Sequence, residues 1–280
     1  MTVAQALREA EARLSAAGVP APRLDAERLL RHVTGWDAAR LIASLRNTLP
    51  STAAAEYAVL VDQRARRRPL QHLTGEQAFW KHEFTVTPDV LIPRPETELL
   101  VEAALELLAG REAPFVVDVG TGSGCIAISI ALERRDADVW ALDVSPAALR
   151  VAAGNALRLG AERIHFLESD LLQSVPQLTG RVDLVVSNPP YVDPAEIPTL
   201  QPEVRDHEPR AALHAPEGCE ALYARLAREA AALLRPGGAL AVEMGMGMET
   251  PVRQAMAAAG LSVDRVIADL QQIPRIVIAR

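Results

Sequence analysis

The sequence has few cysteines, no long apolar run and no excess of basic residues. Its 280 residues include only Cys125 and Cys219, which lie far apart, without a CxxC pair or a histidine at metal-ligand spacing. This argues against a disulfide framework and against a metal site, and a reducing, cytoplasmic location fits best. No segment approaches the roughly 18 uninterrupted apolar residues of a membrane span, and the N-terminus lacks a signal-peptide pattern.

The charge balance is acidic overall but differs along the chain. The 36 acidic and 29 basic residues give a net charge of -7, which argues against direct binding of nucleic acid or an anionic membrane. Residues 1–85 nevertheless hold 12 basic and 9 acidic residues. The basic excess is concentrated in Arg64, Arg66, Arg67 and Arg68. Such a run is typical of a solvated helix end, but also of a surface that meets an acidic or RNA-associated partner.

The apolar content is sufficient for a sizeable core in more than one domain. Hydrophobic residues make up 49% of the chain and charged residues 23%, as in ordinary globular proteins. A length of 280 residues predicts two units. We expect a helical substrate-docking domain over residues 1–75, a hairpin linker over 76–95 and a catalytic domain over 96–280. The first domain is predicted to contain short helices, since Gly18 and Gly35 each end a helical pattern.

Beyond residue 96, short apolar runs alternate with helical patterns. The runs are Phe115–Val119, Val139–Leu142, Ile164–Leu167, Val182–Ser187, Ala239–Glu243, Leu261–Ala268 and Ile273–Ala279. This alternation predicts an α/β fold with a seven-stranded, mostly parallel sheet that is covered on both faces. The last two runs are joined by a short link, so we expect them to form a C-terminal hairpin with one antiparallel strand.

The first of these strands leads into a glycine-rich loop, Gly120-Thr121-Gly122-Ser123-Gly124. Glycines at this position let the backbone turn tightly and let a ligand approach the backbone amides. The GxGxG spacing differs by one residue from the GxGxxG of dinucleotide sites, which favours a ligand without a pyrophosphate. Asp118, just before the loop, is badly placed against phosphate but well placed for an ammonium group.

Acidic residues follow the next two strands. Asp143 lies about 20 residues beyond the glycine loop, where a carboxylate can accept from both hydroxyls of a ribose. Asp170 precedes Leu171 after the third strand, where it can accept from an adenine amino group. A nucleoside with an amino-acid tail, S-adenosylmethionine, satisfies all these positions. Taken singly, Asp143 could merely cap the next helix and Asp170 could lie in a turn, but both coincide here with a glycine loop.

The fourth strand leads into Asn188-Pro189-Pro190-Tyr191. The prolines stiffen the backbone, so the Asn188 amide and the Pro189 carbonyl have fixed directions and can accept from an –NH2 group, while Tyr191 offers a flat face. Two acceptors can orient a poorly nucleophilic amide nitrogen toward a sulfonium methyl without a dedicated base. The alternative is a plain proline-rich turn, which the position after the fourth strand disfavours.

Together these motifs resemble class I S-adenosylmethionine-dependent methyltransferases, and more closely the protein-(glutamine-N5) methyltransferases of peptide-chain release factors. Further segments carry the resemblance over nearly the whole chain: Arg68–Glu76, Phe79-Trp80, Leu91–Glu98, Glu208-Pro209 with Ala212-Leu213, and Pro236–Gly238. The resemblance implies a Rossmann-like fold. It also implies a cofactor site in which residues 120–124 hold the methionine part, Asp143 the ribose, and Asp170 with Leu171 the adenine.

The resemblance also implies where the substrate binds. Asn188, Pro189, Pro190 and Tyr191 would hold the glutamine of a Gly-Gly-Gln loop, with Asn188 also at the cofactor, and the roughly 25 irregular residues after Tyr191 would help to enclose it. Arg94, Glu96 and Thr97 would lie near the cofactor mouth. His207 and Leu171 stand where the family often has aromatic residues, which puts stacking contacts in doubt. His165 and His214 are interpreted as core or surface residues and not as bases.

The implied activity is transfer of a methyl group from S-adenosylmethionine to the N5 amide nitrogen of the Gly-Gly-Gln glutamine in class-1 release factors, by a monomer. Alternatives are glutamine methylation of a ribosomal protein, N6-adenine methylation of DNA or RNA, and a cofactor-binding scaffold without turnover. The acidic balance disfavours the nucleic-acid substrate. Intact Asn188 and Tyr191 disfavour the scaffold, and the GxGxG spacing disfavours a dehydrogenase.

Overall fold

The computed structural model describes residues 1–280, which divide into two compact units. The first unit consists of Met1–Glu76 and Leu200–His207. The second consists of Gln77–Thr199 and Glu208–Arg280. The chain therefore crosses between the units three times, and the first unit contains a segment that follows Tyr191 by fewer than ten residues. None of the helices is both long enough and apolar enough to cross a membrane.

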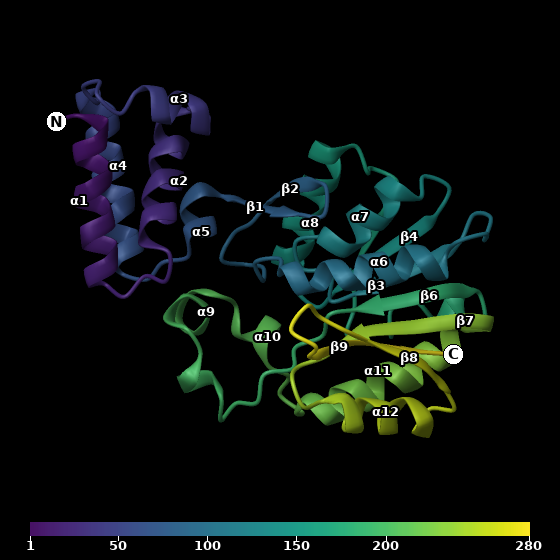
Figure 1. The fold of residues 1–280 in the computed structure, drawn as a ribbon. Helices are drawn as coiled ribbons and strands as arrows, with labels where there is room; N and C mark the ends of the chain where they lie inside the picture. Colours follow the sequence, from purple (N-terminus) through teal and green to yellow (C-terminus); the bar gives the residue numbers. More distant parts are fainter. The chain divides into compact units, whose positions relative to one another are not determined.

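The first unit, here called the helical unit, is built from short helices. They are α1 (Val3–Ala16), α2 (Pro22–Thr34), α3 (Ala38–Ala43), α4 (Ser51–Ala65), α5 (Leu70–Thr74) and α9 (Pro202–His207). Helix α1 begins at a capping box between Thr2 and Gln5, and α2 ends at Gly35 in the left-handed conformation. Helices α1, α2 and α4 lie side by side around buried Leu14, Leu29 and Leu30 (Figure 1).

A buried ion-pair cluster fastens α9 within the helical unit. Arg64 of α4 contacts Asp25 at 2.7 Å and Glu203 of α9 at 2.8 Å. Arg67 adds two hydrogen bonds to Glu203, both 2.7 Å long. These bonds hold the pKa of the Glu203 carboxyl below its usual value against the opposing effect of burial. The interior of the unit therefore uses two of the four arginines in the basic run.

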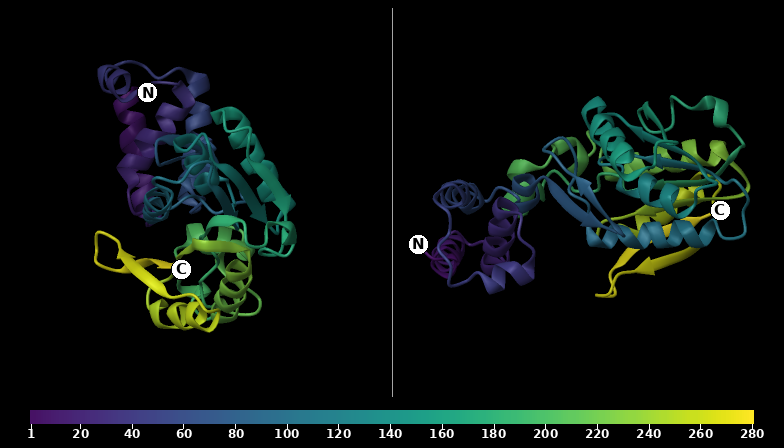
Figure 2. Two further views of the ribbon diagram at one scale, coloured as in Figure 1. Left: turned by 90° about the vertical axis from the view of Figure 1, so that its right-hand side faces the viewer. Right: turned by 90° about the horizontal axis from the view of Figure 1, so that it is seen from above.

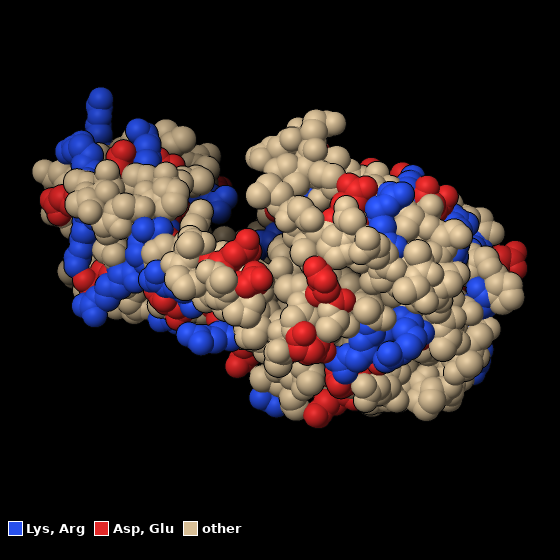
Figure 3. All heavy atoms as spheres, turned by 90° about the horizontal axis from the view of Figure 1, so that it is seen from below, with Lys and Arg blue, Asp and Glu red and all other residues tan.

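The other two arginines of the run lie nearer the surface. Arg66 is exposed and pairs with Asp62 at 2.8 Å, and Arg68 donates to Gln63 at 2.8 Å. Figure 3 shows basic side chains spread over the surface of the helical unit with acidic side chains among them. The run is thus neither simply a solvated helix end nor a surface with four free cations. Arg64 and Arg67 pair with Glu203, whereas Arg66 and Arg68 have partners nearby in the sequence.

The second unit, here called the α/β unit, is built around a large sheet. Its strands are β1 (Glu76–Phe79), which starts at the last residue of the helical unit, β2 (His82–Thr85), β3 (Phe115–Val119), β4 (Asp138–Asp143), β5 (His165–Glu168), β6 (Val182–Ser187), β7 (Leu234–Glu243), β8 (Val263–Ala268) and β9 (Pro274–Ala279). Its main helices are α6 (Glu98–Leu107), α7 (Cys125–Glu133), α8 (Pro146–Leu159), α11 (Cys219–Leu233) and α12 (Glu249–Ala258). Shorter turns are η1 (Pro95–Thr97), η2 (Pro176–Leu178), η3 (Ile197–Thr199) and α10 (Arg210–Leu213).

The large sheet has seven strands in the order β5-β4-β3-β6-β7-β9-β8. Strands β3 to β7 pair in parallel, whereas β9 runs antiparallel to both β7 and β8. Helices α6, α7 and α8 cover one face and α11 and α12 the other (Figures 1 and 2). This confirms the predicted α/β fold with its antiparallel C-terminal hairpin. The strand order reverses between β3 and β6, and ligands bind at such switch points.

Strand β7 is longer than predicted. The apolar run Ala239–Glu243 predicts only its second half, and Pro236, Gly237 and Gly238, residue types that usually interrupt strands, precede that run. In the structure β7 begins at Leu234, which pairs with Val182 before an irregularity shifts the register. The bulge lets the Pro-Gly-Gly segment pass without ending the strand.

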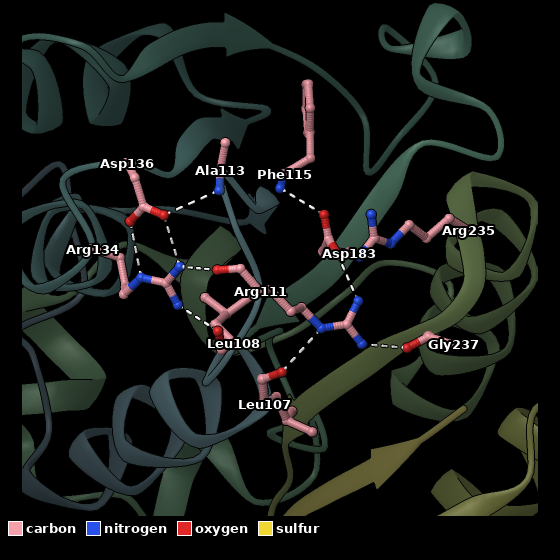
Figure 4. A network of polar contacts seen from close by, with 10 residues as sticks. All are labelled: Leu107, Leu108, Arg111, Ala113, Phe115, Arg134, Asp136, Asp183, Arg235 and Gly237. Atoms are coloured by element: carbon pink, nitrogen blue, oxygen red, sulfur yellow. Dashed lines mark hydrogen bonds and ion pairs between the residues drawn. The ribbon is translucent and has the colours of Figure 1, made fainter.

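A network of polar contacts ties together the amino ends of β3 and β6 (Figure 4). Asp183 is buried and accepts from Arg111 at 2.6 Å and from the Phe115 backbone N–H at 2.9 Å, and Arg235 pairs with it at 2.5 Å. Two cations and a backbone donor thus satisfy one buried carboxylate. The amino ends are closed by this network, and the opposite ends of the same strands lead into the two predicted motifs.

We expect Glu203→Gln to loosen α9 within the helical unit. The variant removes the charge that faces Arg64 and Arg67, which costs about 2 kcal/mol, less than in a fully buried pair because the Arg67 side chain is 21% exposed. Amide hydrogen exchange in residues 203–207 should therefore accelerate about thirtyfold. The control is Glu9→Gln, which changes an exposed carboxylate of α1. Equal exchange in both variants would contradict this role of Glu203.

Candidate active site

A cavity of about 720 Å³ lies at the carboxyl ends of β3, β4, β5 and β6. This volume falls within the range of roughly 300–1,000 Å³ that is typical of sites for small molecules. All residues that line the cavity belong to the α/β unit. They include most of the glycine loop, Asp143, the loop after β5, and the segment that follows β6. The structure therefore brings three separately predicted motifs to one site.

The glycine loop is shaped by the conformations of its glycines. Gly120, Gly122 and Gly124 all have positive φ, and the Gly120 and Thr121 backbone N–H groups both donate to the Leu142 carbonyl. At Gly124 a Cβ atom would lie 2.8 Å from the Cδ1 of Ile128. This last glycine is therefore needed for close packing at the start of α7 as well as for its backbone conformation. Gly120, Thr121, Gly122 and Ser123 line the cavity, and Gly124 lies behind them.

Asp143 is held by two backbone donors at the end of β4. Its Oδ2 accepts from the Gly122 N–H and its Oδ1 from the Ser145 N–H, both at 2.9 Å. Burial raises the pKa of Asp143, and these hydrogen bonds oppose the shift. The N-cap of α8 is Ser145, whose Oγ accepts from the Ala148 N–H at 3.2 Å. Asp143 is thus not the helix cap that the sequence left open, and each of its oxygens keeps a lone pair for a further donor.

Asp118 lies behind the glycine loop and is not part of the cavity lining. Its Oδ2 accepts from the Thr121 hydroxyl at 2.7 Å and from the Ala127 N–H at 3.2 Å, and its Oδ1 has no partner. Complete burial raises the pKa of Asp118 to about 7. The side chain therefore supports the loop from beneath instead of facing a ligand directly.

The loop after β5 combines an ion pair with an unusual backbone conformation. Asp170 accepts two hydrogen bonds from Arg225 of α11, at 2.6 and 2.8 Å. Leu171 has a φ of 49°, in the left-handed region that non-glycine residues seldom adopt, and such strain is often found at ligand sites. Asp170, Leu171 and Arg225 all line the cavity. Sequence reasoning missed Arg225, because a single arginine on a helix 55 residues away carries no local signal.

The Asn-Pro-Pro-Tyr segment is divided between the cavity and the interior. Asn188, Pro189 and Pro190 line the cavity, whereas Tyr191 does not. The Tyr191 hydroxyl donates to Oε1 of Glu243 at 3.3 Å, and a Cβ on Gly245 would lie 2.9 Å from its ring. The predicted flat face of Tyr191 thus packs against backbone. Burial raises the pKa of Tyr191.

Two residues behind Asn188 complete the site. The Asn188 Nδ2 donates to Oγ1 of Thr97 at 3.1 Å, and that hydroxyl donates to Oε2 of Glu243 at 2.6 Å. Glu243 is 2% exposed and ends β7. Sequence reasoning used it only as the end of a strand. One signal was available in the sequence. Glu243 is a single carboxylate at the end of an apolar strand, and that end lies at the same edge of the sheet as the motifs.

The three residues that were predicted to lie near the opening of the cofactor site have different positions. Arg94 and Thr97 line the cavity, whereas Glu96 is exposed and does not. Arg94 donates from one nitrogen to both oxygens of Glu208, at 2.7 and 2.8 Å. Burial raises the pKa of Glu208, and the Arg94 charge opposes that shift. This pair fastens the chain directly after α9 to the segment that precedes α6.

The segment after Tyr191 is less irregular than predicted. It contains η3, α9 and α10, which are too short to produce a recognisable periodicity in the sequence. Residues from Pro209 to Pro216 contribute to the cavity lining, whereas α9 belongs to the helical unit. His207 therefore lies in the helical unit, outside the cavity lining.

The two remaining predicted histidines have different environments. His165 lies on β5 with its ring centroid 4.8 Å from that of Trp140, outside the cavity. His214 lines the cavity, and its Nδ1 lies 3.0 Å from the Ala215 carbonyl. A neutral ring would donate from Nδ1 and keep Nε2 as an acceptor. No three His, Cys, Asp or Glu side chains lie together in a way that could hold a metal ion.

Comparison with known proteins covers nearly the whole chain. Residues 5–75 match the family described as PrmC N-terminal domain, and residues 95–201 match the family described as Methyltransferase small domain. A release factor glutamine methyltransferase of Cereibacter sphaeroides is 46% identical over 284 positions, covering 100% of this chain and 99% of the relative. One of Moorella thermoacetica is 47% identical and covers 93% and 91%, respectively.

A solved structure also resembles the chain. It is a release-factor-specific protein-(glutamine-N5) methyltransferase of Alicyclobacillus acidocaldarius, 31% identical to this chain. The alignment covers 70% of this chain and 98% of that one, with a TM-score of 0.44.

We expect Asp118→Asn to remove a pH dependence of stability. With a folded pKa of about 7 against an ordinary value of 3.8, Asp118 takes up a proton on folding between these two values. Its contribution to the free energy of unfolding is present at low pH and is lost as the pH rises toward 7, by at most about 1.4 kcal/mol per pH unit.

Urea unfolding between about pH 5 and 7 measures this slope. The variant should show a flatter dependence of the unfolding free energy on pH than the original chain. The control is Asp136→Asn, because Asp136 has a pKa of about 2 and does not titrate in this window. An unchanged slope in Asp118→Asn would show that Asp118 is ionised throughout.

Proposed function

The chain belongs to the release factor glutamine methyltransferase family, and from this premise we propose how its cavity carries out the family's reaction. The protein is an S-adenosylmethionine-dependent enzyme that methylates the N5 amide nitrogen of the release-factor glutamine in its Gly-Gly-Gln motif. The proposed mechanism rests on one observation. The Asn188 side-chain amide, with its nitrogen bonded to Thr97, lies in the same cavity as the glycine loop.

We infer that the cofactor lies along the carboxyl ends of β3, β4 and β5. The glycine loop, residues 120–124, would enclose the methionine part through close approach of its backbone, with Gly120 to Ser123 at the cavity wall. The two free lone pairs of Asp143 suit the two ribose hydroxyls. Asp170 would accept from the adenine amino group while Arg225 keeps its carboxylate in place. Leu171 and Val144, a 61% exposed residue of the lining, offer apolar contact to the adenine ring.

The glutamine side chain would bind against Asn188, Pro189 and Pro190. The Asn188 Oδ1 and the Pro189 carbonyl accept the two N–H bonds of the glutamine amide, which fixes the nitrogen and directs its lone pair. Tyr191 supports this segment from the interior through its bond to Glu243. Such orientation lowers the entropic part of the barrier, and the fixed acceptors stabilise the positive charge that develops on nitrogen.

When bound, S-adenosylmethionine supplies an electrophilic methyl group on its sulfonium. The glutamine nitrogen would take the methyl group as the sulfonium becomes a neutral thioether, and the proton released from nitrogen would pass to water. The residues around the nitrogen act as hydrogen-bond acceptors and not as strong bases.

We further infer that the helical unit docks the body of the release factor. None of its residues lines the cavity, so its surface remains for recognition of the protein substrate. The exposed Arg66 is the member of the basic run that is best placed to meet an acidic partner. We propose that the protein acts as a monomer in the cytoplasm, where translation factors function, and binds no nucleic acid directly.

We expect Asn188→Ala to abolish most of the activity while the protein remains folded. Loss of one fixed acceptor at the reacting nitrogen should lower kcat by about 10² to 10³. Mass spectrometry of tryptic release-factor peptides measures a single added methyl group on glutamine. The control is Asn47→Ala, which changes an exposed residue of the helical unit.

The substrate is tested in the same assay. A release factor with Gly-Gly-Ala in place of Gly-Gly-Gln should remain unmethylated. Methyl transfer to a ribosomal protein or to adenine in nucleic acid, with none to the release factor, would overturn the proposed substrate.

A further inference from the structure

Three polar side chains form a line of hydrogen bonds behind the glutamine-binding position. Glu243 Oε2 accepts from the Thr97 hydroxyl at 2.6 Å, and Asn188 Nδ2 lies 3.1 Å from the same hydroxyl oxygen. Thr97 and Glu243 are each 2% exposed, so water does not compete for these bonds. The three residues come from η1, from the end of β6 and from the end of β7.

The single hydrogen of the Thr97 hydroxyl determines the polarity of this line. A carboxylate only accepts, so Thr97 must donate its hydrogen to Glu243. Thr97 then presents only lone pairs to Asn188, and only the –NH2 end of the Asn188 amide can satisfy them. The Asn188 oxygen is left for the substrate. A reversed amide would oppose its own –NH2 group to the –NH2 group of the glutamine.

We propose that Glu243 and Thr97 are positioning residues that fix the Asn188 amide with its oxygen toward the substrate nitrogen. This inference rests on the proposed function, because it assigns the two residues a role in orienting the glutamine amide. It also explains why a buried carboxylate lies at the end of β7. An unpaired charge there would be costly, and the hydroxyl groups of Thr97 and Tyr191 bind the two carboxylate oxygens instead.

Several groups around Glu243 influence whether its carboxyl is ionised and accepts hydrogen bonds. Tyr191 donates to its Oε1 at 3.3 Å, and Tyr223 of α11 donates to its backbone carbonyl at 2.8 Å. The positive charge of Arg275 on β9 favours the ionised form, whereas Glu96 of η1 opposes it, and the buried Cys125 thiol of α7 also faces this group. Burial raises the pKa of Glu243 against the bonds from Thr97 and Tyr191.

Protonation of Glu243 on Oε2, the oxygen that faces Thr97, would allow the line to reverse. A protonated Glu243 donates to Thr97, Thr97 then donates to the Asn188 oxygen, and the Asn188 –NH2 group faces the substrate. Activity therefore belongs to the ionised form. We expect kcat to fall on the acid side as the pH drops through the raised pKa of Glu243.

The test compares two substitutions at Thr97. Thr97→Val keeps the shape but removes the hydroxyl, and we expect it to lower kcat between about 10- and 100-fold. Thr97→Ser keeps the hydroxyl but removes the methyl group, and its kcat should stay within about threefold of the original. The dissociation constant for S-adenosylmethionine should change little in either variant. A packing role predicts the opposite ranking, with Val active and Ser impaired.

The pH profile gives a second measurement. Glu243→Gln should lose the acid limb of the kcat profile and have low activity throughout, since a neutral amide cannot enforce one polarity. Thermal unfolding of each variant checks that it is folded. The proposal is overturned if folded Thr97→Val retains its kcat, or if Thr97→Val and Thr97→Ser lose equal activity.

A measurement without substrate separates this proposal from the proposed function. In selectively labelled protein, the Asn188 side-chain –NH2 protons should exchange slowly with solvent and should exchange faster in Thr97→Val. If the original chain left release-factor glutamine unmethylated, the proposed function would fail, and the exchange of the Asn188 amide would still decide its orientation. Equal exchange of the Asn188 amide in the original chain and in Thr97→Val would overturn the proposal that Thr97 fixes this amide.

Discussion

The parallel pairing of β3 with β6 is the interaction on which the site depends. Val119 lies opposite Ser187 in this pair, and the Ser187 hydroxyl donates to the Val119 carbonyl at 2.7 Å. The next residue on each strand belongs to a motif, Gly120 on one and Asn188 on the other. Since neighbouring strands lie about 4.8 Å apart, this register alone brings the proposed cofactor loop and the proposed acceptor amide together. A shift of either strand by one residue would turn the motif of that strand toward the wrong face.

Local sequence was enough to predict the elements that carry their own signal. The glycine loop, Asp143 and Asn188 each follow a recognisable apolar strand, and the sheet order places strand ends at one edge. The contacts that complete the site could not be predicted in the same way. Thr97 and Glu243 are separated by 146 residues, and neither residue type at its position identifies the other. Such pairs can be recognised only once the topology of the sheet is known.

Charge patterns were the least reliable guide. The run of arginines at the end of α4 has the composition of an exposed basic surface, yet Arg64 and Arg67 are bound to Glu203. Glu203 is 136 residues away from Arg67, and nothing in the sequence around it indicates that it pairs with these arginines. In contrast, the short helices of the same unit were predicted from local signals, because a helix end such as Gly35 is marked within the sequence itself. Tertiary ion pairs have no such repeated pattern.

The return of residues 200–207 to the helical unit makes that unit discontinuous in the gene. A coding segment for the first 76 residues alone would lack α9 and leave Arg67 without its carboxylate. Exchange of whole domains by recombination at a single boundary is therefore obstructed. The two units are expected to be inherited together, and a single proteolytic cut between them would not release either one.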